Sequence, residues 1–137
     1  MALPVRRIDH VVFRVRDLAR VRAFWIDVLG AQEERVQAEI GLHHLRLGDF
    51  LIDLVPVDGP LGRAGGAPPD PAAANVDHLC LLVDPWDGDA VLAHLAAHGI
   101  AAHITSRYGA AGQGPSVYLA DPEGNRLELR GPAAEAA

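Results

Sequence analysis

The chain has 137 residues, of which half are apolar and 22% are charged, and its net charge is -6. This composition is ordinary for a globular protein, and an acidic chain without a basic cluster is not expected to bind nucleic acid. Cys80 is the only cysteine, which excludes an intrachain disulfide and favours a reducing compartment. No apolar run is long enough to span a membrane, and the N-terminus lacks a signal-peptide core. We therefore expect a cytoplasmic protein without a membrane partner.

Two similar hydrophobic runs, residues 8–15 and 76–83, each begin with an Asp-His pair. Both are rich in β-branched and aliphatic residues, which predicts strands. Side chains alternate between the two faces of a strand. His10 and His78 therefore occupy the same place and the same face of two equivalent strands, which indicates an internal repeat.

The first half of the chain predicts the order β-α-β-β-β. A strand at 7–15 is followed by Asp17, a plausible helix N-cap, and by apolar residues at helical spacing up to Gly30. Three extended segments follow at 31–38, 42–47 and 50–55, with glycines at the turns. Residues 1–57 are thus predicted to form one module.

Residues 58–75 are rich in Gly, Pro and Ala, and we expect a linker with little regular structure. The second module is predicted at 76–131, with a strand at 76–83 and a helix at 87–98. Its extended segments are expected at 100–106, 115–120 and 125–130, with a mobile glycine-rich loop at 108–115. Residues 132–137 are predicted to be a disordered tail. The expected fold class is α+β, with two β-α-β-β-β modules forming an open, barrel-like cleft.

Each module ends on a strand that carries a carboxylate within an apolar run, Asp53 in the first and Glu128 in the second. Alternation places these carboxylates on the same face as the two histidines. If the two modules face each other, two imidazoles and two carboxylates converge. Such a set, with open coordination positions, suits a divalent first-row metal such as Fe, Co, Ni, Mn or Zn.

Residues 8–30, together with the closing hairpin at 117–129, resemble the vicinal oxygen chelate superfamily. That group includes glyoxalase I, extradiol dioxygenases, and bleomycin and fosfomycin resistance proteins. The resemblance implies metal positions at His10, Asp53, His78 and Glu128. Glyoxalase-like members usually have Glu where this chain has Asp53, so Asp53 is either a direct ligand or a residue beside the ligands.

The resemblance implies a metal-dependent, glyoxalase-like enzyme of lyase or isomerase type that chelates vicinal oxygens of a small-molecule substrate. Glu128 would move a proton in that reaction. An extradiol dioxygenase is the first alternative, because Tyr118 stands ten residues before Glu128, as a substrate-binding tyrosine does in those enzymes. A protein that sequesters an antibiotic without catalysis is the second alternative. Small superfamily members are often homodimers, and we expect one here.

Several other side chains leave two interpretations open. Tyr118 either binds substrate or only lines the cleft, and the latter is favoured. Cys80 is expected to be a small buried residue without nucleophilic function. Alternation allows three residues to face the cleft and touch substrate or to lie on an exposed strand face, which is favoured: His44, Arg46 and His103. His94 and His98, four residues apart on the second helix, either bind a metal or lie on its exposed face, which is favoured.

Overall fold

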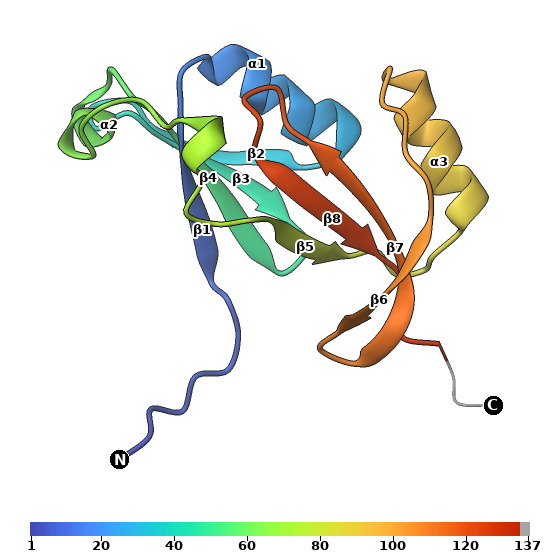
Figure 1. Cartoon of the computed structure of the whole chain (residues 1–137). Coiled ribbons are helices and arrows are strands. Elements are labelled where there is room, and N and C mark those ends of the chain that lie inside the picture. The colour runs from blue at the N-terminus through green and yellow to red at the C-terminus, as the bar shows by residue number, and fades with distance from the viewer. Residues whose placement is uncertain (135–137) are drawn as a thin grey trace. The chain divides into compact units, whose positions relative to one another are not determined.

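A computed structural model describes residues 1–134 of the chain, which divides into two compact units (Figure 1). The first unit runs from Met1 to Asp70, and the second begins at Pro71. Each unit contains one four-stranded sheet, with the strand orders β1-β4-β3-β2 and β5-β8-β7-β6. The predicted α+β fold and the repeated β-α-β-β-β order are confirmed, and both sheets are open sheets rather than closed barrels.

The elements of the first unit are β1 His10–Val15, α1 Leu18–Ala23, β2 Gln32–Gln37, β3 Leu42–Leu47, β4 Phe50–Pro56 and α2 Pro60–Ala64. Those of the second unit are β5 Leu79–Leu82, α3 Gly88–Ala97, β6 Thr105–Gly109, β7 Gly112–Ala120 and β8 Arg126–Arg130. The first strand of each unit pairs in parallel with the last one, and the other pairings are antiparallel. The last strand therefore lies at the centre of each sheet, beside the strand that follows the Asp-His pair.

The main helix of each unit follows an aspartate N-cap, of which Asp17 was predicted, and is followed by a glycine. Asp17 and Asp87 are the N-caps, and each carboxylate accepts a backbone N–H three residues later at 3.1 Å. Gly30 and Gly99 follow the helices with φ of 78° and 74°, a region that favours glycine. The helix after Asp17 continues as a π-helical turn over Phe24–Val28.

The apolar face of each sheet forms the core of its unit. Ile52 and Leu54 of β4 are fully buried, as is Trp25 of the helical segment. In the second unit Val117 and Leu127 are fully buried in the same way. The opposite face of the central strand is therefore the one left to carry polar site residues. No helix within residues 1–134 combines the length and the apolar content that crossing a lipid bilayer requires.

Three predicted segments differ from the structure: residues 58–75, 100–106 and 108–115. Residues 58–75 contain α2 and a short 3-10 turn at Pro71–Ala73. The helix α2 begins at Pro60, with Gly59 as its N-cap, and Arg14 donates hydrogen bonds to backbone carbonyls in and just after it. The expected loop at 108–115 instead forms the paired tip of the β6–β7 hairpin, and the strand expected at 100–106 begins only at Thr105. Residues 132–134 have no regular structure, and the rest of the predicted tail lies outside the described residues.

Candidate functional site

The first unit places His10 and Asp53 on the same face of its sheet. Val12 of β1 lies opposite Asp53 of β4, so His10 is two residues away along the neighbouring strand. Both side chains line a pocket of about 680 Å³, together with Arg14. Strand alternation therefore predicted correctly that His10 and Asp53 lie on the same face of the sheet.

The imidazole of His10 is fixed by its neighbour in the chain. Its Nδ1 donates a hydrogen bond to Oδ2 of Asp9 at 2.7 Å. This bond raises the pKa of His10 and lowers the pKa of Asp9. Because Nδ1 is engaged, Nε2 is the nitrogen left for a ligand, which is how carboxylates commonly orient metal-binding histidines.

Asp53 is only 2% exposed and is bound by His44 from the adjacent strand β3. Nδ1 of His44 lies 2.9 Å from Oδ1 of Asp53, and its Nε2 lies 2.9 Å from the side-chain nitrogen of Gln37. An amide nitrogen donates, so Nε2 of His44 accepts and Nδ1 donates to Asp53. The exposed-surface interpretation of His44 is therefore wrong, because the β3–β4 register places His44 directly opposite Asp53.

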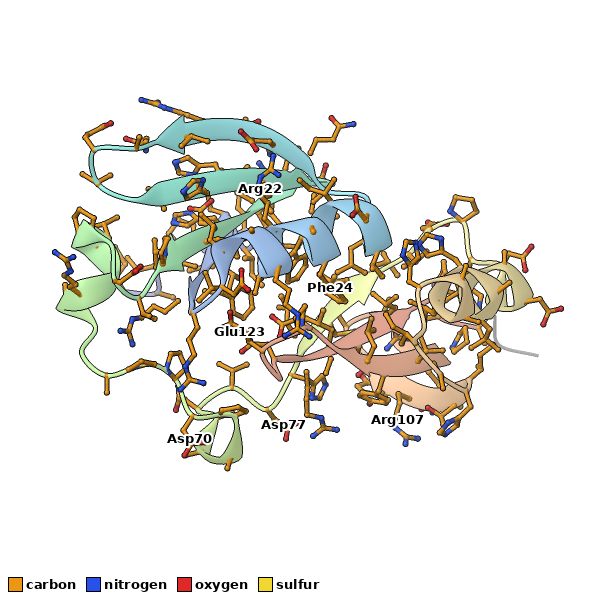
Figure 2. All side chains as sticks on the ribbon, turned by 90° about the horizontal axis from the view of Figure 1, so that it is seen from above. Arg22, Phe24, Asp70, Asp77, Arg107 and Glu123 are labelled. Atoms are coloured by element: carbon orange, nitrogen blue, oxygen red, sulfur yellow. The ribbon has the colours of Figure 1, made fainter. Side chains whose placement is uncertain are left out.

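The second unit repeats the arrangement with a closer contact between its two residues. Nδ1 of His78 donates to Oδ2 of Asp77 at 2.7 Å, while Nε2 lies 3.1 Å from Oε1 of Glu128. Asp77, labelled in Figure 2, precedes β5 and also lies 3.3 Å from the Arg126 guanidinium. The bond to His78 and the charge of Arg126 lower the pKa of Asp77.

Glu128 is 5% exposed, and its second oxygen is occupied. The hydroxyl of Ser116, on β7, donates to Oε2 at 2.7 Å. Burial alone would raise the pKa of Glu128, but the hydrogen bonds from Ser116, Tyr118 and Cys80 bring it below its ordinary value. Ser116 is a site residue that was not predicted, although it stands two residues before Tyr118 on the same strand face.

Tyr118 lies directly opposite Glu128 in the β7–β8 pairing. Its ring meets the His78 ring edge-on at a centroid distance of 5.5 Å. The guanidinium of Arg107, labelled in Figure 2, lies 5.8 Å from the Tyr118 ring centroid. Burial, together with the bond to Glu128, raises the pKa of Tyr118. Its hydroxyl is thus kept protonated beside the carboxylate.

Cys80 corrects a prediction, because it is exposed rather than buried. It lies opposite Glu128 across the β5–β8 pair. Partial burial of the thiol and the bond to Glu128 raise the pKa of Cys80 to about 12. The expectation that it is not a nucleophile is consistent with this value.

Among the other candidate residues, Arg46 lies opposite Leu51, a pocket residue that itself pairs with His10. Arg46 pairs with Glu34 at 2.9 Å, and His103 is exposed. His94 and His98 are on the exposed surface of α3, as predicted. Within residues 1–134, no group of three or more His, Cys, Asp or Glu side chains is arranged to hold a metal ion. Each unit places one of the two predicted histidines on the face of one buried carboxylate, His10 with Asp53 and His78 with Glu128.

The model of the Glyoxalase/Bleomycin resistance protein/Dioxygenase superfamily matches residues 7–129, and the chain belongs to this superfamily. It is 30% identical over 132 residues to the uncharacterized protein YaeR of Escherichia coli K12, covering 93% of this chain and 97% of that protein. It is 28% identical over 131 residues to virulence protein STM3117 of Salmonella typhimurium LT2, covering 91% and 83% of the two chains.

Solved structures share the fold. The crystal structure of the same virulence protein matches with a TM-score of 0.78 at 23% identity, over 96% of this chain and 100% of that one. Lactoylglutathione lyase from Agrobacterium tumefaciens matches with a TM-score of 0.65 at 21% identity, over 94% and 96% of the chains. At these identities the likeness establishes the fold and no more.

Proposed function

We propose that this protein is a metal-dependent, glyoxalase-like enzyme of lyase or isomerase type that chelates vicinal oxygens of a small substrate. One repeated observation carries the proposal. In both units Nδ1 of a histidine donates a hydrogen bond to the preceding aspartate at 2.7 Å, and a buried carboxylate stands on the same sheet face. A carboxylate bound to Nδ1 orients the ring and makes Nε2 a stronger metal ligand.

The donor types fit a divalent ion such as Ni, Co, Zn, Mn or Fe, the identity of which stays open. His10, His78 and Glu128 would be the ligands, with Asp53 as a fourth or an indirect one. These metals take roughly four to six ligands, and each unit alone offers two. The proposal therefore requires both pairs to contribute to one ion, within one chain or across a dimer.

A bound divalent metal would act as a Lewis acid that polarises a substrate oxygen. The chain's own residues supply the proton transfer. Glu128 has a lowered pKa and is ionised at neutral pH, so it is equipped to accept a proton from a substrate carbon. Ser116 donates to Oε2, and Nε2 of His78 lies 3.1 Å from Oε1, so both oxygens of this carboxylate are held in place. Tyr118 stays protonated and is placed to donate a hydrogen bond.

The place of Tyr118 beside His78 and Glu128 also favours a second candidate, an extradiol dioxygenase. Two assays separate the candidates: isomerisation of a thiol adduct of methylglyoxal by Ni- or Co-loaded protein, and ring cleavage of a catechol by Fe(II)-loaded protein. The glyoxalase-like proposal expects only the first activity. Ring cleavage that needs iron and is abolished in Tyr118→Phe would establish the second candidate instead. Inactivity in both assays without metal binding would favour a ligand-sequestering protein.

We also propose that the protein is a homodimer, the state that is frequent among small members of this superfamily. Sedimentation at micromolar concentration tests this with and without added metal. A dimer is expected in the metal-loaded protein. A metal-loaded monomer would contradict it.

A further inference from the structure

The pocket of the first unit has an aliphatic wall and a polar end. Its apolar lining consists of Val12, Leu42, Leu51, Val55 and Leu61. A volume of about 680 Å³ is in the range of small-molecule sites. Its polar end holds His10 and Asp53, the residues proposed above for the metal.

Each charged aspartate or arginine that lines this pocket already has a partner. Asp9 is bound to His10, and Asp53 to His44. The Arg14 guanidinium donates to the backbone carbonyls of Gly62, Gly66 and Ala67. An ionised ligand group at the aliphatic wall would lose water without gaining a counter-charge there, which is unfavourable.

The same arginine fixes α2 as one wall. Its Nη2 lies 2.9 Å from the Gly62 carbonyl and 2.6 Å from that of Gly66. Two glycines allow this close approach. A Cβ on Gly62 would lie 1.7 Å from the Pro56 carbonyl oxygen, and a Cβ on Gly65 would lie 2.3 Å from Nε of Arg14. The helix that carries Leu61 onto the pocket is therefore held by a specific fit.

This wall is a feature of the first unit rather than of the repeat. Arg14 pairs with Val55 in the β1–β4 register, and Leu82 holds the equivalent place in the β5–β8 register. Leu82 is 65% exposed. The hydrogen bonds from Arg14 to α2 are thus an addition to the repeated fold, as expected for an element that selects a ligand.

We infer that the pocket of the first unit binds a neutral, apolar part of the substrate, and that α2, positioned by Arg14, is the wall that selects it. That this ligand is a substrate rests on the proposed function, whereas its neutral, apolar character is inferred from the pocket alone. An anionic substituent at this end of the ligand is disfavoured, whereas oxygens belong at the end where His10 lies.

Two fluorescent naphthalenes that differ by one sulfonate test the ligand chemistry on metal-free protein in EDTA. N-phenyl-1-naphthylamine is neutral, and 8-anilino-1-naphthalenesulfonate is its anionic counterpart. The neutral compound should bind with one site per chain and roughly tenfold or more tightly than the anion. Equal binding of both compounds, or no binding of the neutral one, would overturn the inference.

Matched variants locate the site. Leu61→Asp should weaken binding of the neutral naphthalene roughly tenfold or more, because it puts a charge on the apolar wall. Val36→Asp is the control, since Val36 is 41% exposed against 42% for Leu61 and does not line the pocket.

Arg14→Gln should weaken binding and also speed amide exchange over residues 61–67. Unchanged binding in Leu61→Asp, with its circular dichroism intact, would overturn the assignment. The proposed function fails separately, in metal titrations without the naphthalenes.

Discussion

Nε2 of His78 lies 3.1 Å from Oε1 of Glu128, and the other polar atom of each side chain is already engaged. Nδ1 of the imidazole binds Asp77, and Oε2 of the carboxylate accepts from Ser116, each at 2.7 Å. One nitrogen and one oxygen therefore face each other with their orientations fixed. A metal-binding pair needs this kind of fixed orientation.

The Asp-His bond predicts a specific effect of a conservative change. Asp77→Asn weakens the hydrogen bond that fixes His78, and metal affinity should fall roughly tenfold or more while the fold is retained. Titration calorimetry with Ni or Zn measures it. Asp49→Asn, a change in the exposed β3–β4 turn, is the control and should bind as wild type. Wild-type affinity in Asp77→Asn would show that the bond has no role in metal binding.

Local signals in the sequence predicted much of the fold and part of the site. Strand alternation predicted which face Asp53 and Glu128 occupy, and Asp17 and Gly30 predicted the limits of the first helical segment. These features depend on neighbours in the chain or on a period of two residues. The matching of His10 to His78 depends on the repeat alone.

Features that depend on contacts between distant residues were missed. The helix α2 forms in a Gly- and Pro-rich segment because Arg14, about fifty residues earlier, binds its carbonyls. The β6–β7 hairpin forms around glycines because Arg130 fills the space beside Gly109 and Gly114. The contact from His44 to Asp53 requires the register of two strands. Such contacts leave no local signal in a single sequence.

Asp53 is expected to be a weak or indirect metal ligand. It is one methylene shorter than the usual Glu, and His44 occupies its Oδ1 at 2.9 Å. Asp53→Ala should lose less metal affinity than Glu128→Ala, and Asp53→Glu should match or exceed wild type. Thermal melting of the metal-free variants controls for the unpaired His44, which costs about 1–3 kcal/mol. Complete loss of metal in both alanine variants would make Asp53 a full ligand.

Cys80 should react slowly despite its exposure. Its pKa is raised from 9.0 to about 12, so little thiolate is present at neutral pH. Alkylation by iodoacetamide in the folded protein should be roughly a hundredfold or more slower than in urea, and should speed up as the pH rises. Glu128→Gln removes the neighbouring charge and should accelerate it. Equal rates in folded and urea-unfolded protein would contradict this account.

Glu128 should make the metal-free protein sensitive to acid. Its pKa in the folded state lies below the ordinary 4.5, so the folded protein binds fewer protons than the unfolded chain near that pH. The stability that Glu128 contributes is present above pH 4.5 and is lost as the pH falls through the folded value. Urea unfolding at several pH values should therefore show a smaller acid loss in Glu128→Gln than in wild type. A change at the exposed Glu39 to Gln should leave the profile unchanged. Identical profiles for wild type and Glu128→Gln would refute the assignment.

Metal content is the most direct test of the central claim. Wild-type protein incubated with Fe, Co, Ni, Mn or Zn and then dialysed should retain about one ion per chain, and the ion should raise the melting temperature because it binds the folded state. His78→Ala and Glu128→Ala should lose the ion, whereas His103→Ala, an exposed histidine outside the site, should keep it. Wild-type protein that stays metal-free with all five ions, and whose melting temperature does not move, would contradict the account.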